Sequence, residues 1–262
     1  MKFTPFSFVN KGFATVDIDY LIVGGGGAAG QEDSAFLTGG GGGGAGQFIS
    51  SSTTILLNPE LSFPIIIGTG GTDPGVSYTQ GLPGSSSSFL GFTAVGGGGG
   101  GARQQLGGGV GASGGGATFF GTSTAGGGTA TAGFNGAASF YTTQPSPIGT
   151  RRSGGGGGAG GAATTGTLVS QSVAGPPKAW LDGNQYAGGG ASDDGIGGYN
   201  SLSGSGGQGN TSALAVNGNA GIVKIRYAGT ASLFIGGETS VSGGYVYHTF
   251  PSSSTLLPIL QD

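Results

Sequence analysis

Glycine tracts restrict how this chain can fold more than any other feature. Glycine provides 67 of the 262 residues, and runs of three to six consecutive glycines recur along the sequence. Each glycine in a helix interior costs about 1 kcal/mol relative to alanine, so long α-helices are excluded. The runs follow no Gly-X-Y period, which excludes a collagen triple helix. They occupy residues 24–27, 39–44, 96–101, 107–109, 114–116, 126–128, 154–158 and 188–190.

The composition favours an ordered chain despite this glycine content. Disordered segments combine low hydrophobicity with high net charge. Here charged residues make up only 7% of the chain, hydrophobic residues make up 35%, and the net charge is −3. The eight basic residues are spread thinly and form no stripe, so we expect no nucleic-acid partner.

Short apolar and β-branched segments between the tracts predict strands. In the first of them Val16, Ile18, Tyr20 and Ile22 share one side. A hairpin is expected near the C-terminus, with Gly243-Gly244 as its turn. The expected strands lie within residues 14–23, 53–57, 63–67, 89–95, 221–227 and 241–250.

Glycine tracts can adopt an extended helical conformation in which several segments pack side by side, and side chains usually prevent such packing. A glycine run can form an extended left-handed helix of the polyproline II type, with three residues per turn. Without Cβ atoms, several such helices can pack closely and bond through their backbone N–H groups. We therefore predict a mostly β and irregular fold, with short edge strands, packed polyglycine helices and almost no α-helix. Flexible linkers and ordered loops on a small β-core are the alternatives.

Two regions are expected along the chain. Residues 1–229 form the glycine-rich domain, and residues 230–262 form a C-terminal hairpin and an apolar tail. The tail is a candidate assembly segment, buried against a partner or another copy. Its candidate residues are Leu256, Leu257, Ile259 and Leu260.

Four segments resemble the glycine-rich domain of phage tail fibres and related bacterial proteins. They occur in the family's order, and they are YLIVGGGG at 20–27, FLGFTAV with its glycines at 89–101, GIVKIRY at 221–227 and GGYVYHTF at 243–250. The resemblance implies a virion or surface protein, with packed glycine helices and variable loops at one end. It also implies a role in host attachment, at a tail fibre or its tip.

The size of the chain keeps other roles open, because it is one module without a fibre shaft. The first alternative is a purely structural role, as a capsid decoration protein or a filament subunit. The second is the extracellular glycine-rich module of a receptor or matrix protein.

The motifs that could indicate catalysis are incomplete. Gly25, Gly27 and Gly30 match a dinucleotide-binding pattern, but that site needs a following helix and an acidic residue about 20 positions on. Six glycines follow instead, from residue 39, and no acid occurs between Asp33 and Glu60. No lysine follows a glycine as a phosphate-binding loop requires.

Metal and nucleophile chemistry is equally poorly supported. There is one histidine, His248, and no cysteine. Asp193-Asp194 could ligate calcium, but adjacent acids are more often solvated turn residues. We expect no enzyme, no cofactor and no metal site.

Two glycine-poor segments are candidates for recognition, because loops on a rigid scaffold often carry binding. They cover residues 141–152 and 176–199, and aromatic side chains there suit sugar faces or protein pockets. The alternative is that these rings pack against the sheet or a neighbouring subunit. The candidate receptor-binding residues are Tyr141, Arg151, Arg152, Trp180, Tyr186 and Tyr199.

The N-terminus lacks the apolar region of a secretion signal, and no stretch approaches about 18 consecutive apolar residues. We therefore expect no membrane insertion and a location in the virion. The expected partners are further copies of the chain, other virion proteins, and a host surface glycan or outer-membrane protein.

Overall fold

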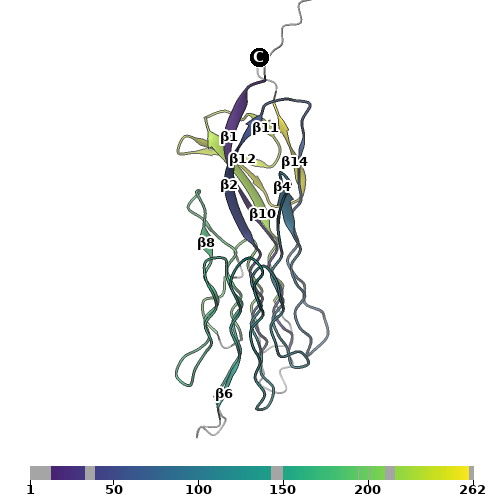
Figure 1. The fold of residues 1–262 in the computed structure, drawn as a ribbon, viewed down its shortest axis with the longest axis vertical. Coiled ribbons are helices and arrows are strands. Elements are labelled where there is room, and N and C mark those ends of the chain that lie inside the picture. Colours follow the sequence, from purple (N-terminus) through teal and green to yellow (C-terminus); the bar gives the residue numbers. More distant parts are fainter. Residues whose placement is uncertain are drawn as a thin grey trace, which may run out of the picture.

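The computed structural model describes residues 13–32, 39–142, 150–193, 195–199, 201–209 and 216–259. Figure 1 shows an elongated molecule with its main strands at one end and a bundle of extended segments running away from them. Among the described residues no segment is helical. The predicted fold class, mostly β and irregular, is confirmed.

The sheet end is built on one antiparallel sheet of five strands. Its central strand β1 bonds β10 on one side and β2 on the other, so residues near the two ends of the chain meet here. In spatial order the strands are β12 (Glu238–Ser242), β13 (Tyr245–Phe250), β10 (Ile222–Ala228), β1 (Thr15–Val23) and β2 (Phe48–Leu56).

A second layer covers one face of this sheet. Strand β14 (Ser254–Pro258) lies between β11 (Phe234–Ile235) and β3 (Phe63–Ile65). The hairpin of β4 (Ser87–Phe89) and β5 (Phe92–Ala94) continues the layer through an Ile66–Ser88 bridge. Two further hairpins join β6 (Phe140–Thr142) to β7 (Thr150–Arg152) and β8 (Lys178–Ala179) to β9 (Gln185–Tyr186).

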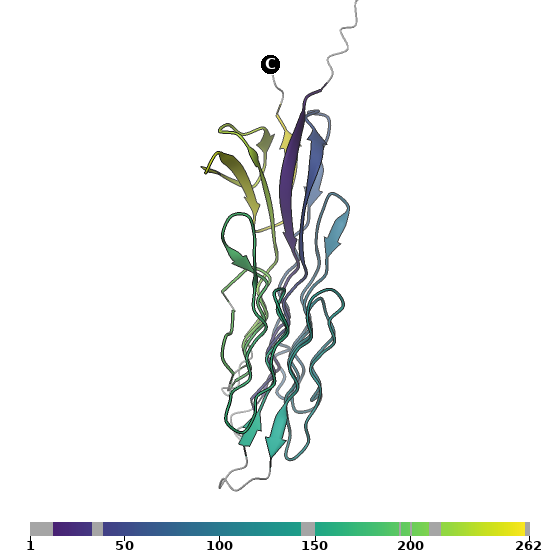
Figure 2. The ribbon, with the colours of Figure 1, turned by 60° about the vertical axis from the view of Figure 1, so that its left-hand side comes forward.

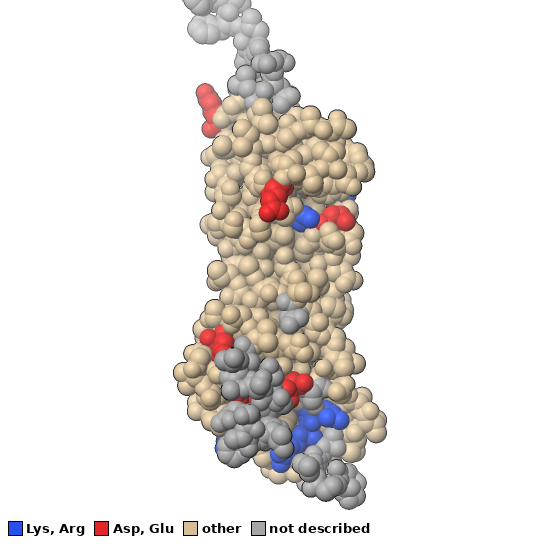
Figure 3. All heavy atoms as spheres, turned by 180° about the vertical axis from the view of Figure 1, so that it is seen from behind, with Lys and Arg blue, Asp and Glu red and all other residues tan. Residues whose placement is uncertain are grey.

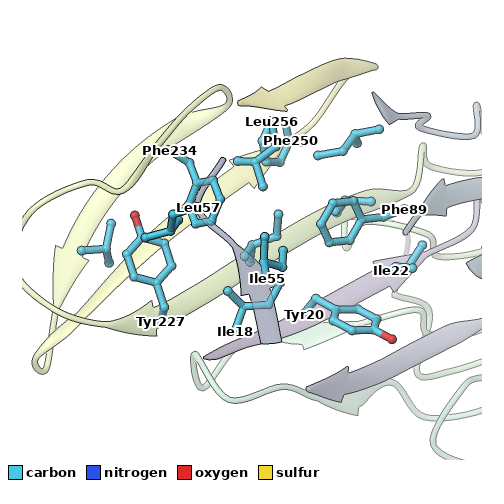
Figure 4. Close-up of a cluster of buried hydrophobic side chains, with 14 of the residues drawn as sticks. Ile18, Tyr20, Ile22, Ile55, Leu57, Phe89, Tyr227, Phe234, Phe250 and Leu256 are labelled. Carbon is cyan, nitrogen blue, oxygen red and sulfur yellow. The ribbon is translucent and has the colours of Figure 1, made fainter. Parts of the chain in front are cut away.

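The main hydrophobic core lies between the two layers (Figure 4). Ile18, Tyr20 and Ile22 point into it, as the alternation in β1 predicts. Phe234 and Leu256 belong to the same cluster, so the core extends across the 229/230 position at which the sequence suggested two regions.

Below the sheet, the glycine tracts bond to one another with a period of three residues. In the segment that continues β1, every third N–H donates to the same neighbouring segment, and successive N–H groups point to three different neighbours. This is the periodicity of a polyproline II-type helix. The donor–acceptor pairs are Gly24–Gln47, Gly27–Gly44 and Gly30–Gly41; Gly25–Ser85, Ala28–Leu82 and Gln31–Thr79; and Gly26–Asn219 and Ala29–Val216.

The same segment accepts bonds from three more neighbours, through the N–H groups of Gly71, Gly97 and Gly207. It is therefore surrounded on six sides. The tract at 39–44 is surrounded in the same way. None of the glycines in the eight tracts has a positive φ. The tracts are thus packed helices, and neither flexible linkers nor loops on a β-core describe them.

At most central positions of this bundle only glycine fits, although Ala28, Ala29 and Ala45 are also buried there. A Cβ built on Gly27 would lie 2.2 Å from the carbonyl oxygen of Gly98, and one on Gly43 would lie 2.0 Å from that of Gly27. Both obstacles are backbone atoms of bonded neighbours, so they cannot move aside without loss of the hydrogen bonds.

Replacing Gly43 with alanine should therefore destabilise the protein by at least about 3 kcal/mol, because the added methyl forces neighbouring helices apart. Gly126 is the matched control, since a Cβ there meets nothing within 4 Å. Gly126→Ala should be neutral or stabilising by up to about 1 kcal/mol, through the unfolded state. Denaturant unfolding of both variants measures the difference, and equal effects would contradict close packing of the tracts.

Candidate binding site at the loop end

The end of the bundle away from the main sheet carries turns that connect the tracts (Figure 2). Thr118 and Ser153 fix two of these connections, because both side-chain hydroxyls donate to the carbonyl oxygen of Gly39, at 2.6 and 2.5 Å. Thr118 directly precedes the bulky residue Phe119, and Ser153 directly follows Arg152. The turns are thereby attached to the start of a central tract.

An arginine lies between two aromatic rings at this end. The Arg103 guanidinium carbon is 3.9 Å from the centre of the Phe120 ring and 4.9 Å from that of Tyr78. Cation–π contacts of this kind hold the planar guanidinium in a defined orientation. Phe120 is 40% exposed, so one side of the cluster faces solvent.

Tyr78 occupies this position at a conformational cost. Its φ is +68°, a left-handed value that non-glycine residues seldom adopt. Two backbone bonds hold it there, from Tyr78 N–H to the Gln31 carbonyl and from Gln104 N–H to the Tyr78 carbonyl. Strain of this kind concentrates at functional sites, which makes the cluster a candidate for function.

Arg151 extends the cluster from the β6–β7 hairpin. It is paired with Tyr141 across the hairpin, and its guanidinium carbon is 5.9 Å from the Tyr141 ring centre and 5.8 Å from that of Phe119. The two groups are linked through the adjacent residues Phe119 and Phe120. We refer to them together as the arginine–aromatic cluster, which comprises Tyr78, Arg103, Phe119, Phe120, Tyr141 and Arg151. Basic side chains gather at this end in the rear view of Figure 3, with acidic ones nearby.

Three of the six predicted receptor-binding residues therefore lie together. Tyr141 and Arg151 belong to the cluster, and Arg152 is next to it in β7. Arg103, Tyr78 and Phe120 escaped the sequence reasoning. Position could have indicated two of them, since Arg103 and Phe120 follow glycine tracts at the turns where those tracts end, whereas Tyr78 borders none of the eight tracts.

Trp180 and Tyr186 lie elsewhere, on the second face of the main sheet. Each is only 5% exposed, and both pack in a cluster with Leu21 and Val23. The Trp180 indole donates to the Ser50 hydroxyl at 3.0 Å. These rings attach the β8–β9 hairpin to the sheet, which is the packing alternative that the sequence left open. Tyr199 is half-buried against Gly188, where a Cβ would come within 2.4 Å of it.

A buried ionic network strengthens that attachment. Asp182 accepts bonds from Lys224 at 2.5 Å and from the Tyr186 hydroxyl at 2.6 Å. Burial tends to raise the pKa of Asp182, but the hydrogen bonds from Lys224, Tyr186 and Asn184 outweigh it and lower the pKa from 3.8 to about 2. The charged carboxylate is therefore the form that the fold prefers.

The candidate assembly residues lie in and just after β14, a strand of the second layer. Leu256 is fully buried in the chain's own core, so it is not available to a partner, contrary to the expectation for the tail. It is buried because β14 pairs with β3 and β11. Leu257 is 39% exposed and Ile259 is half-buried, and their role in assembly stays a prediction. Leu260 lies outside the described residues.

The described residues contain no group of three or more potential metal ligands. Asp193 lies among them, whereas Asp194 does not. His248 is fully buried, and its Nε2 lies 3.1 Å from the Tyr227 hydroxyl. Burial lowers its pKa, so the neutral ring is favoured. No helix long and apolar enough to cross a bilayer occurs in the described part of the chain.

Comparison with known families decides which fold family this is. The profile of a family described as a glycine-rich domain matches residues 9–228, which is most of the chain. The chain belongs to the glycine-rich domain family. The match covers β1 to β10 and all the tracts, and it ends with β10, before β11 and the β12–β13 hairpin. No curated protein matches the chain.

The ionic network of this glycine-rich domain predicts acid sensitivity. The pKa of Asp182 is lower in the folded state, so its stabilisation is present above about pH 4 and is lost as the pH falls towards 2. Trp180 is the only tryptophan, and its fluorescence reports on the hairpin. The emission should change between pH 4 and 2 in the native chain and lose this transition in Asp182→Asn. An unchanged acid transition in that variant would assign it to other carboxylates.

Proposed function

We propose that this glycine-rich domain is a structural protein of a phage virion, at the tail fibre or its tip, and that its loop end contacts the host surface. The observation that carries the proposal is the arginine–aromatic cluster at the end of a close-packed bundle. Binding residues commonly occupy loops on a rigid scaffold. Three separate turns and the β6–β7 hairpin contribute to this cluster.

The residue types of the cluster suit a host surface glycan or an outer-membrane protein. Aromatic rings pack on sugar faces and protein side chains, and guanidinium groups recognise carboxylate and phosphate groups. The exposed face of Phe120 provides the apolar contact, next to Arg103. Arg152 is included among the proposed receptor-binding residues because it is adjacent to Arg151 in β7.

The position of the site relative to the rest of the chain also supports attachment. The first and last strands, β1 and β14, are both at the sheet end, and β6 is at the opposite end (Figure 1). A fibre or particle can therefore hold the sheet end while the loop end points outwards.

A purely structural role, as capsid decoration or a filament subunit, is favoured by a different feature. The sheet end exposes several large apolar side chains, among them Ile66, Phe92 and Val241. Exposed apolar side chains contribute to protein–protein contacts where they gather into a patch. They are compatible with assembly in either role, whereas the loop-end cluster favours attachment.

Binding of the purified chain to host cells, and its competition with virion adsorption, tests the proposal. Phe120→Ala should weaken cell binding by about tenfold or more, as loss of an interface anchor does. Val241→Ala is the matched control, because Val241 is equally apolar and 54% exposed but lies in β12. Thermal unfolding confirms that both variants are folded. A folded chain that neither binds nor competes would favour the purely structural role.

A further inference from the structure

The free edge of β2 is unusual among sheet edges. This nine-residue strand is the last one in the five-stranded sheet, and among the described residues it pairs only with β1. Its sequence, FISSSTTIL, contains no charge and no proline. Natural sheets protect long edges with charged residues, prolines, bulges or a covering segment. β2 has the composition of a strand that a further strand covers.

A hollow lies beside each half of this edge. The inner hollow has a volume of about 320 Å³ and opens towards the second layer. Thr53 and Thr54 line it together with the apolar side chains of Ile55, Leu56, Leu61, Phe63, Leu90 and Phe92. The outer hollow has a volume of about 350 Å³ and lies on the opposite face of the sheet, beside Phe48, Ser50 and Trp180. The two hollows are on opposite faces and about five residues apart along β2.

Leu90 lines the inner hollow in a strained conformation. Leu90 and Gly91 form the two-residue turn of the β4–β5 hairpin, and both have positive φ, +51° and +79°. Such turns favour asparagine or glycine at both positions. A leucine at the first position has a side chain that packs against the core and into the hollow. An apolar occupant of the hollow would account for a leucine at this turn.

We propose that residues 3–9 of the same chain add to the free edge of β2 as a sixth strand. This segment reads FTPFSFV, and it lies almost wholly before residue 9, where the family match begins. It joins β1 beside the edge, because Thr15 is opposite Leu56. The edge is two strand spacings away, about 10 Å. Ala14 still bonds Leu57 in line with the β1–β2 ladder, so residues 10–13 must span this distance. They reach that far at about 3.3 Å each, and Asn10-Lys11-Gly12 suits a turn.

The spacing of the phenylalanines matches the two hollows. The chain enters β1 from the sheet end, so the added strand would run parallel to β2. Side chains alternate between faces along a strand. Phe3 and Phe8 are five residues apart and therefore face opposite ways. In this direction Phe8 meets the inner hollow and Phe3 the outer hollow, while Phe6 shares the inner face. Pro5, which has no N–H, is acceptable on the solvent side of an edge strand.

The tether favours the chain's own segment over that of a second copy. A short linker gives an effective concentration in the millimolar range, which exceeds the concentration of free chains in solution. Docking within one chain therefore leaves the protein monomeric. A segment of a second copy would instead link chains together.

Amide hydrogen exchange tests the proposal in the full chain. The amides of β2 that point away from β1 should exchange slowly, because they bond the added strand. A variant lacking residues 2–8, and the full-length double variant F6S/F8S, should both lose this protection. Thr4→Ser is the control that keeps every phenylalanine. Amides of the glycine tracts should stay protected in all variants, which shows that the domain is folded.

Two outcomes would overturn the proposal. Equal exchange of the β2 amides in the full chain and in both variants would show that the segment does not cover the edge. Protection that rises with protein concentration, together with a dimer in light scattering, would assign the edge to a second copy. A synthetic peptide of residues 2–9 added to the shortened chain should restore the slow exchange. None of these measurements depends on host binding.

Discussion

The backbone hydrogen bond between neighbouring glycine tracts is the interaction on which the rest of this molecule depends. Ordering glycine costs more conformational entropy than ordering any other residue. An isolated tract cannot recover that cost, because a polyproline II-type helix has no internal hydrogen bonds. Each central tract instead bonds to six others, and at positions such as Gly27 and Gly43 those contacts leave no room for a Cβ. The glycine composition is therefore the condition for the bonding pattern, and the bundle should form cooperatively.

The β-sheet provides the alignment that a featureless glycine tract lacks. Val23 is opposite Phe48 in the β1–β2 ladder, and in the same register Gly24 donates to Gln47 and Gly27 to Gly44. The β1–β10 ladder continues likewise, with Gly26 bonded to Asn219. Register in a sheet is specified by which side chains enter the core. The apolar core thus fixes the register of the glycine tracts, which have no side chains to fix their own.

The sequence predicts the core-facing residues of β1 and the packed glycine helices, because both depend on local patterns. Alternation in β1 identifies Ile18, Tyr20 and Ile22 as core residues, and glycine runs identify the packed helices. Arg103 and Tyr78 could not be predicted as partners, because separate turns bring them together. The segment around Trp180 reads locally as an exposed loop. It is buried because the hairpin folds back on the sheet and pairs Asp182 with Lys224, a contact between residues 42 positions apart.

The bonding pattern also separates the chemistry of the loop end from the stability of the fold. The bundle is held by backbone atoms and the core by side chains at the sheet end, so residues such as Phe120 and Arg151 contribute little to either. Their turns must only join tracts whose positions are already fixed. Substitutions at the loop end can then change what the surface recognises while the scaffold stays intact. Within the tracts the reverse holds, since a single methyl group at Gly43 would meet a bonded backbone.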